Sequence, residues 1–123
     1  MPIWLAVTLG GAFGTLGRYG VGVWARALWP AFPAATLIVN VLGGLVMGLL
    51  ASYAAARPEW SGAWRLGLMT GVLGGFTTFS AFSLETLVLW REGALGLALV
   101  NVALNVILSL LACALGLLLG RSL

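Results

Sequence analysis

The chain has 123 residues, of which 62% are hydrophobic and 7% are charged, and this excludes an ordinary soluble domain, in which about 25% of residues are charged. Its net charge of +3 comes from scattered arginines, which excludes a basic patch for nucleic acid. Histidine is absent and cysteine occurs once, so the chain has no metal-ligand cluster or catalytic constellation, and we expect no enzyme.

Four apolar segments follow one another along the chain. A hydrocarbon core of roughly 30 Å takes about 20 apolar residues per helix, so the length allows four spans in a single domain, residues 1–123. The tryptophans fall near the expected helix ends, as an aromatic belt requires. The sequence predicts an all-α membrane protein with helices at residues 3–28, 33–56, 64–90 and 93–120.

The first segment has no basic residue before it and is too long for a signal-peptide core, so we interpret it as a span. One of its faces consists of Ala6, Gly10, Gly14, Arg18 and Gly22. Close packing against another helix explains the small residues. Arg18 should lie near the far interface, where it either pairs with Glu85 or forms a vestibule that attracts anions.

The second segment repeats this arrangement with a polar residue in the middle of the face. Thr36, Asn40, Gly44 and Gly48 lie four residues apart. The glycines again indicate close helix packing, whereas Asn40 either joins helices by hydrogen bonds or lines a path.

The third segment contains the string G-G-F-T-T-F-S-A-F, from Gly74 to Phe82. Glycines loosen a helix, and threonines are β-branched with hydroxyls that compete for backbone groups. In lipid, a loosened backbone survives only inside protein or beside a cavity, and transporters place ion sites at such breaks. We therefore expect the third helix to be broken in mid-membrane, and we expect transport rather than anchoring.

The fourth segment carries Asn101, Asn105 and Ser109 on one face. One asparagine is enough to join two helices, so this row favours a path for a solute over simple helix association. Amide and hydroxyl donors, together with the positive ring edges of Phe79 and Phe82, suit a small anion.

The arginines give no instruction about orientation in the membrane. With four spans, Arg57, Arg65 and Arg121 lie at one face, and Arg18, Arg26 and Arg91 lie at or near the other. An asymmetry of basic residues normally sets the orientation. Its absence predicts dual topology, in which chains inserted both ways pair as an antiparallel homodimer; the alternative is a weak bias decided by the insertion machinery.

Three strings resemble the Fluc family of small bacterial fluoride channels, and the resemblance covers essentially the whole chain. They are Gly10-Gly11-x-x-Gly14 leading to Arg18-Tyr19, Thr36-Leu37-Ile38-Val39-Asn40-Val41-Leu42-Gly43, and Gly71-x-x-Gly74-Gly75-x-Thr77-Thr78-Phe79-Ser80-x-Phe82. The resemblance implies a dual-topology antiparallel homodimer in the bacterial inner membrane, with two pores that each involve both subunits. It also implies a selective channel that lets fluoride leave the cytoplasm passively and so lowers its toxicity.

The resemblance further implies roles for individual residues. Asn40 matches a pore asparagine, and Phe79 and Phe82 match the rings of a fluoride-coordinating box. Gly74 and Thr77 match positions whose backbone carbonyls hold a structural Na⁺ at the dimer centre. The residues assigned to the pore are Asn40, Thr78, Phe79, Ser80, Phe82, Asn105 and Ser109, with Arg18 in the vestibule.

This sequence departs from the family pattern at Thr15, Ala35 and Ala81, and serine is common where Asn105 stands, which affects the pore lining. Two other functions are open. A small multidrug exporter, coupled to protons, needs a carboxylate in the membrane, and Glu85 sits late in its helix. A structural subunit without transport needs neither the row of asparagines nor the broken helix.

Overall fold

The computed structural model describes all residues, 1–123, and every regular element in it is helical. The elements are α1 (Ile3–Leu28), α2 (Ala34–Ala56), α3 (Gly62–Leu66), the π-helix η1 (Gly67–Leu73), α4 (Gly74–Phe76), α5 (Phe79–Arg91) and α6 (Leu95–Gly120). The short elements from α3 to α5 together form the third long segment. The predicted helices are thus confirmed, with ends within two residues of those expected.

Three segments are long and apolar enough to cross a membrane, namely Ala34–Ala56, Gly62–Arg91 and Leu95–Gly120. The α1 helix has 26 residues but does not reach the same hydropathy, because two arginines and a series of glycines interrupt it. The chain is therefore a multi-pass membrane protein with three candidate spans, one fewer than the four expected.

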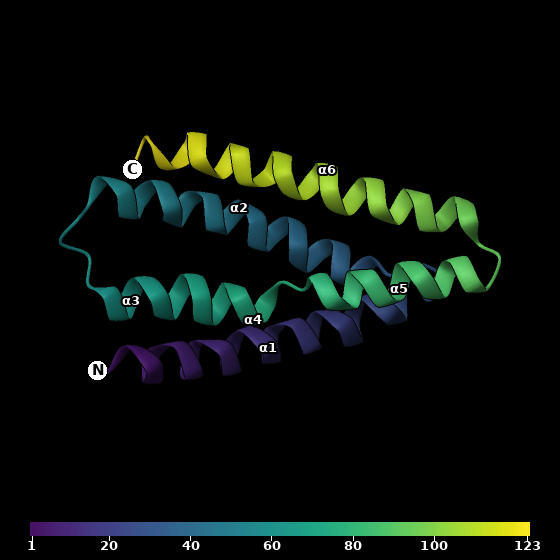
Figure 1. Ribbon diagram of the computed structural model, residues 1–123, viewed down its shortest axis with the longest axis horizontal. Helices are drawn as coiled ribbons and strands as arrows, with labels where there is room; N and C mark the ends of the chain where they lie inside the picture. The colour runs from purple at the N-terminus through teal and green to yellow at the C-terminus, as the bar shows by residue number, and fades with distance from the viewer.

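The long segments run back and forth as a bundle, with both termini at the same end (Figure 1). α1 lies along the first half of the third segment, and α2 lies along α6 (Figure 1). α5 contacts mainly α6, so the third segment leaves α1 and approaches α6 after its break. The bundle therefore consists of two closely packed helix pairs joined by α5.

Glycines bring both pairs into backbone contact. A Cβ atom added to Gly71 or Gly75 would lie 2.8 Å or 2.6 Å from a carbonyl oxygen of α1. In the other pair, a Cβ atom on Gly44 would lie 2.9 Å from the carbonyl oxygen of Ser109. All three distances are too short for a real side chain, so the predicted packing of small residues is confirmed in both pairs.

The third segment is broken in its middle, as predicted, but the two glycines are not the break. Gly74 and Gly75 are helical, and the extended backbone is confined to Thr77 (φ −85°, ψ 159°) and Thr78 (φ −154°, ψ 122°). The Thr77 hydroxyl donates to the carbonyl of Leu73, 2.9 Å away, and the Thr78 hydroxyl caps α5 by accepting from the Ala81 N–H at 3.1 Å. Threonine hydroxyls therefore end one helix and begin the next, and the glycines serve contact with α1.

Candidate functional site: a polar cavity beside the helix break

A cavity of about 400 Å³ lies where the break faces α2 and α6. Its wall contains six of the seven residues assigned to the pore, namely Asn40, Thr78, Phe79, Phe82, Asn105 and Ser109. Thr77, apolar residues and glycines complete it, and no side chain in the wall is titratable. The seventh assigned residue, Ser80, lies outside the wall, but its hydroxyl is 3.2 Å from the Thr78 hydroxyl.

Asn40 replaces the helical hydrogen bonds that Thr78 loses at the break. Its Oδ1 accepts from the Thr78 N–H at 2.8 Å, and its Nδ2 donates to the Thr78 carbonyl at 3.0 Å. Thr78 is buried, so both backbone groups need a partner inside the protein. The side chain of α2 therefore holds the extended backbone of the third segment in place.

The three asparagines are bonded to one another rather than left open to the cavity. Asn40 Nδ2 also donates to Asn105 Oδ1 at 3.0 Å, and Asn105 Nδ2 donates to the carbonyl and Oδ1 of Asn101, each at 3.0 Å. Both amide protons of Asn40 and Asn105 thus have protein acceptors. Helix association and cavity lining, which the sequence posed as alternatives, are combined in Asn40 and Asn105.

Ser109 provides the hydroxyl that remains free. Its Oγ is buried and has no hydrogen-bond partner, and the residue lines the cavity. A buried hydroxyl without a partner is unfavourable unless a solute or water satisfies it. Ser109 therefore contributes to this wall a hydroxyl that makes no hydrogen bond within the chain.

The two phenylalanines lie against each other but in different surroundings. Their ring centroids are 5.3 Å apart with an interplanar angle of 60°. Phe82 is packed inside the chain, whereas Phe79 is 76% exposed. The pair thus continues the cavity wall outward to the surface of the single chain.

Arg18 lies beside the break on the side away from this cavity. Its Nε donates to the Gly75 carbonyl at 3.0 Å, while a Glu85 carboxylate oxygen accepts from the Thr36 hydroxyl at 2.9 Å. The alternative in which Arg18 pairs with Glu85 is therefore wrong. Both residues line a second cavity of about 480 Å³ that also contains Arg26 and Glu92, so Arg18 does face an open, charged space.

The break also frees the two carbonyls assigned to a cation. The usual helical donor to the Gly74 carbonyl is the Thr78 N–H, which donates to Asn40 instead. The usual donor to the Thr77 carbonyl is the Ala81 N–H, which donates to the Thr78 hydroxyl instead. Both oxygens have lost these partners, and Gly74 is exposed on the single chain. Carbonyl oxygens are ligands that suit hard cations, so these residues fit a Na⁺ site.

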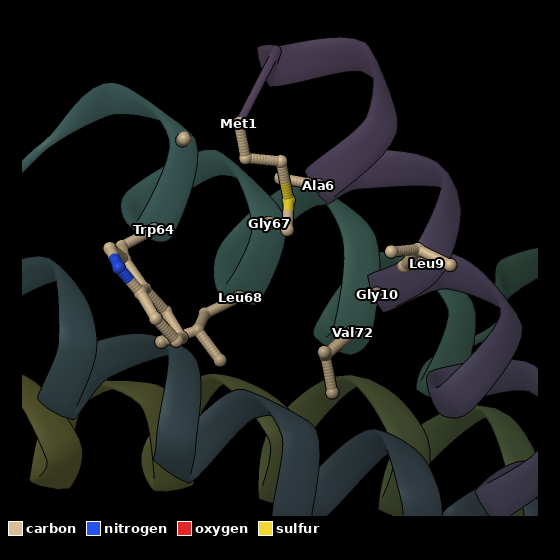
Figure 2. Close-up of a pocket in the computed structure, with 9 residues that line it drawn as sticks. Met1, Ala6, Leu9, Gly10, Trp64, Gly67, Leu68 and Val72 are labelled. Carbon is tan, nitrogen blue, oxygen red and sulfur yellow. The ribbon is translucent and has the colours of Figure 1, made fainter.

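A third pocket, of about 240 Å³, lies between the start of α1 and the region from α3 to η1 (Figure 2). Its lining includes Met1, Trp64 and Leu68 and no charged side chain. None of the residues assigned to the pore or the cation site lies there. Its lining is almost wholly apolar and shares no residue with the cavity beside the break.

The sequence analysis missed Thr86, whose hydroxyl accepts from Asn101 Nδ2 at 2.9 Å. A signal was present, because Thr86 stands four residues after Phe82, on the same face of α5. Its bond to Asn101 depends on how α5 meets α6, which helical spacing does not reveal.

Known proteins with similar sequences cover nearly the whole chain. The family model described as "CrcB-like protein, Camphor Resistance (CrcB)" matches residues 5–117. A protein of Paracoccus denitrificans named "Fluoride-specific ion channel FluC" is 51% identical over 121 residues, which cover 97% of this chain and 94% of the relative. Proteins of the same name from Agrobacterium fabrum (48% over 118 residues) and Caulobacter vibrioides (49% over 119) each match 95% of this chain and 94% of their own length.

Proposed function

This chain belongs to the CrcB-like family, and on that premise we propose that it is a fluoride-selective channel through which fluoride leaves the cytoplasm passively. The observation that carries the proposal is the cavity beside the break, where the free Ser109 hydroxyl lies among carboxamides and phenyl rings. A hydroxyl donor and positive ring edges can replace part of the water around a small anion. The bacterial inner membrane is the corresponding location, and passive export lowers intracellular fluoride toxicity.

A proton-coupled exporter is not favoured. Such a carrier needs a carboxylate at its binding site, and the cavity wall contains no titratable side chain. Glu85 lies in the second cavity, where Thr36 occupies one of its oxygens. A structural subunit is equally hard to reconcile with a buried hydroxyl that has no partner inside the chain.

The proposed assembly is an antiparallel homodimer of chains with four spans, including α1, inserted in both orientations. Both termini lie at one end of the bundle, which suits an even number of crossings (Figure 1). The exposed Phe79 ring and the cavity open beside it suit a wall completed by a second copy. Balanced arginines at the two ends allow both orientations.

The proposed structural ion is Na⁺, held by the backbone carbonyls of Gly74 and Thr77 from both copies. Two freed carbonyls from each chain, meeting at a two-fold axis, make four oxygen ligands. The ion would offset the partial negative charge of carbonyls that have lost their helical donors. We expect dimers purified without Na⁺ to lose fluoride transport and to recover it when Na⁺ is added back.

Fluoride efflux from liposomes that contain the purified protein tests the transport. We expect rapid fluoride efflux, negligible chloride efflux and no dependence on a pH gradient, with the Phe82→Ile variant slowed. Chloride efflux at the rate of fluoride, or no efflux from folded dimer, would overturn the proposal. Full activity after replacing Asn40, Phe79 and Phe82 together would favour the structural subunit instead.

The orientation is tested separately with a single reactive cysteine. Ser122→Cys in a Cys113→Ala background places the thiol at the exposed C-terminus. In cells, a membrane-impermeant maleimide should label about half of the chains if both orientations occur. Labelling of all chains, or of none, would show a single orientation and would leave the transport result unaffected.

A further inference from the structure

A continuous series of hydrogen bonds leaves the beginning of α5, crosses α2 and α6, and returns to α5. The Thr78 N–H donates to Asn40 Oδ1 (2.8 Å), and Asn40 Nδ2 donates to Asn105 Oδ1 (3.0 Å). Asn105 Nδ2 donates to Asn101 Oδ1 (3.0 Å), and Asn101 Nδ2 donates to the Thr86 hydroxyl (2.9 Å). The Thr86 hydroxyl donates to the Phe82 carbonyl (2.7 Å). We call these six residues the amide relay. Asn101 is completely buried and Asn105 nearly so, so their bonds are not shared with solvent.

The direction of the relay is fixed by its two ends. A backbone N–H, that of Thr78, can only donate, and a backbone carbonyl, that of Phe82, can only accept. Turning over any carboxamide in between would place two donors or two acceptors against each other. The positions of the amide nitrogen and oxygen in each asparagine therefore follow from their hydrogen-bond partners.

The relay spans the part of α5 that carries both phenylalanines. It begins at Thr78, one residue before Phe79, and ends on the carbonyl of Phe82. Thr86 and Asn101 lie outside the walls of both polar cavities, yet Asn101 Oδ1 accepts one bond from Asn105 Nδ2, whose other bond goes to the Asn101 carbonyl, and Asn105 in turn accepts from Asn40. Removing the Thr86 hydroxyl leaves buried Asn101 Nδ2 without an acceptor, and removing the Asn101 carboxamide leaves Asn105 Nδ2 with the Asn101 carbonyl as its one acceptor.

We propose that Thr86 and Asn101 are positioning residues for the fluoride path: they fix the direction of the Asn105 carboxamide, which accepts from Asn40 in the cavity wall, and the turn of α5 that presents Phe79 and Phe82. The inference rests on the proposed function. It concerns residues that need not touch the ion, and it predicts that they act as one unit with Asn40.

Fluoride efflux from liposomes distinguishes the relay from ordinary packing. Thr86→Val keeps the side-chain shape but removes the hydroxyl, and we expect about tenfold slower efflux. Thr86→Ser keeps the hydroxyl and should remain within about twofold of the natural protein. The matched control is Thr8→Val, which removes a hydroxyl bonded to the Trp4 carbonyl on an exposed face of α1 and should have no effect.

A double-variant cycle tests whether the relay is a unit. Asn101→Leu alone should also slow efflux about tenfold, and it repeats the test on another helix if Thr86→Val does not fold. Both changes together should be no slower than the slower single variant, because the relay is already broken. If efflux in the double variant were about 100-fold slower, as expected for two independent tenfold effects, the inference would be overturned. Normal efflux in Thr86→Val would overturn it as well. Absence of fluoride efflux from the natural protein would instead overturn the proposed function.

Discussion

The two helix pairs of this bundle solve the same packing problem with different chemistry. Where α1 meets η1 and α4, glycines bring backbone against backbone, and Arg18 to Gly75 is the one side-chain hydrogen bond across the contact. Where α2 meets α6, glycines close one half, and the other half is held open by carboxamides around a cavity. Glycines set how near two helices come, whereas directed hydrogen bonds are needed to hold space between them.

Replacing Asn40 should have the largest effect on the cavity between α2 and α6. In Asn40→Leu, the N–H and carbonyl of buried Thr78 both lose their partner, at about 1–3 kcal/mol each. We expect fluoride efflux to fall about 100-fold in liposomes. Ser52→Ala is the matched control on α2, because it removes a bond to the Leu117 carbonyl in the glycine half and should leave efflux unchanged. An equal loss of fluoride efflux in Asn40→Leu and Ser52→Ala would contradict the division of the α2–α6 contact into a glycine half and a carboxamide half.

Adding one methyl group where α1 packs against the third segment should lower the stability of the protein and leave the cavity unchanged. A Cβ on Gly14 would collide with the backbone of Val72, so Gly14→Ala should destabilise the protein by about 1–3 kcal/mol. Gly20→Ala lies on the same helix with nothing within 4 Å and should be neutral or slightly stabilising. Thermal melting in detergent measures the difference. A melting temperature of Gly14→Ala equal to that of Gly20→Ala would exclude the backbone contact.

Features that depend on neighbouring residues of one segment can be predicted from the sequence alone, whereas contacts between residues far apart in the chain cannot. Helical spacing along one chain segment is enough to predict the four segments and the glycine faces, whereas the grouping of Asn40, Asn105, Phe82 and Ser109 follows from the resemblance to the Fluc family. It cannot reveal which helices face one another, because that depends on contacts between distant residues. The bonds from Thr86 to Asn101 and from Arg18 to Gly75 are of this kind.

The break itself shows where local reasoning fails. Glycine is flexible in an isolated helix, so Gly74 and Gly75 are the natural candidates for a break. In the protein, α1 packs on Gly75 and keeps this turn helical, while Asn40 provides the partners that let Thr78 leave the helix. The tertiary partner, more than the local preference, decides which residue becomes extended.

Truncating the two phenylalanines should separate the packing of one chain from the contact between chains. We expect Phe82→Ala and Phe79→Ala each to slow fluoride efflux about tenfold. Because Phe82 is buried and Phe79 is exposed, Phe82→Ala should lower the melting temperature, whereas Phe79→Ala should raise the fraction of monomer on dilution in lipid. Single-molecule photobleaching counts the copies. An unchanged dimer fraction in Phe79→Ala would place that ring outside the proposed interface.

The smallest effect is expected from the charge beside the break. Arg18→Gln removes a cation from the second cavity and should slow fluoride efflux about two- to threefold at low ionic strength. The difference should shrink at high salt, because screening acts on exposed charges. Arg65→Gln, an exposed arginine at the other end of the bundle, is the control. A salt-independent loss would indicate that the bond to the Gly75 carbonyl, not the charge, matters.

The glycine contact between α1 and the third segment also has a consequence for the order of assembly. Glycine has no side chain, so closing this contact orders few rotamers and loses little side-chain entropy. The amides between α2 and α6 must each find one orientation before their interface closes. Yet α1 precedes the third segment in the chain, so this contact can close only after Gly75 has been made. Until then Arg18 lacks the carbonyl that it later bonds.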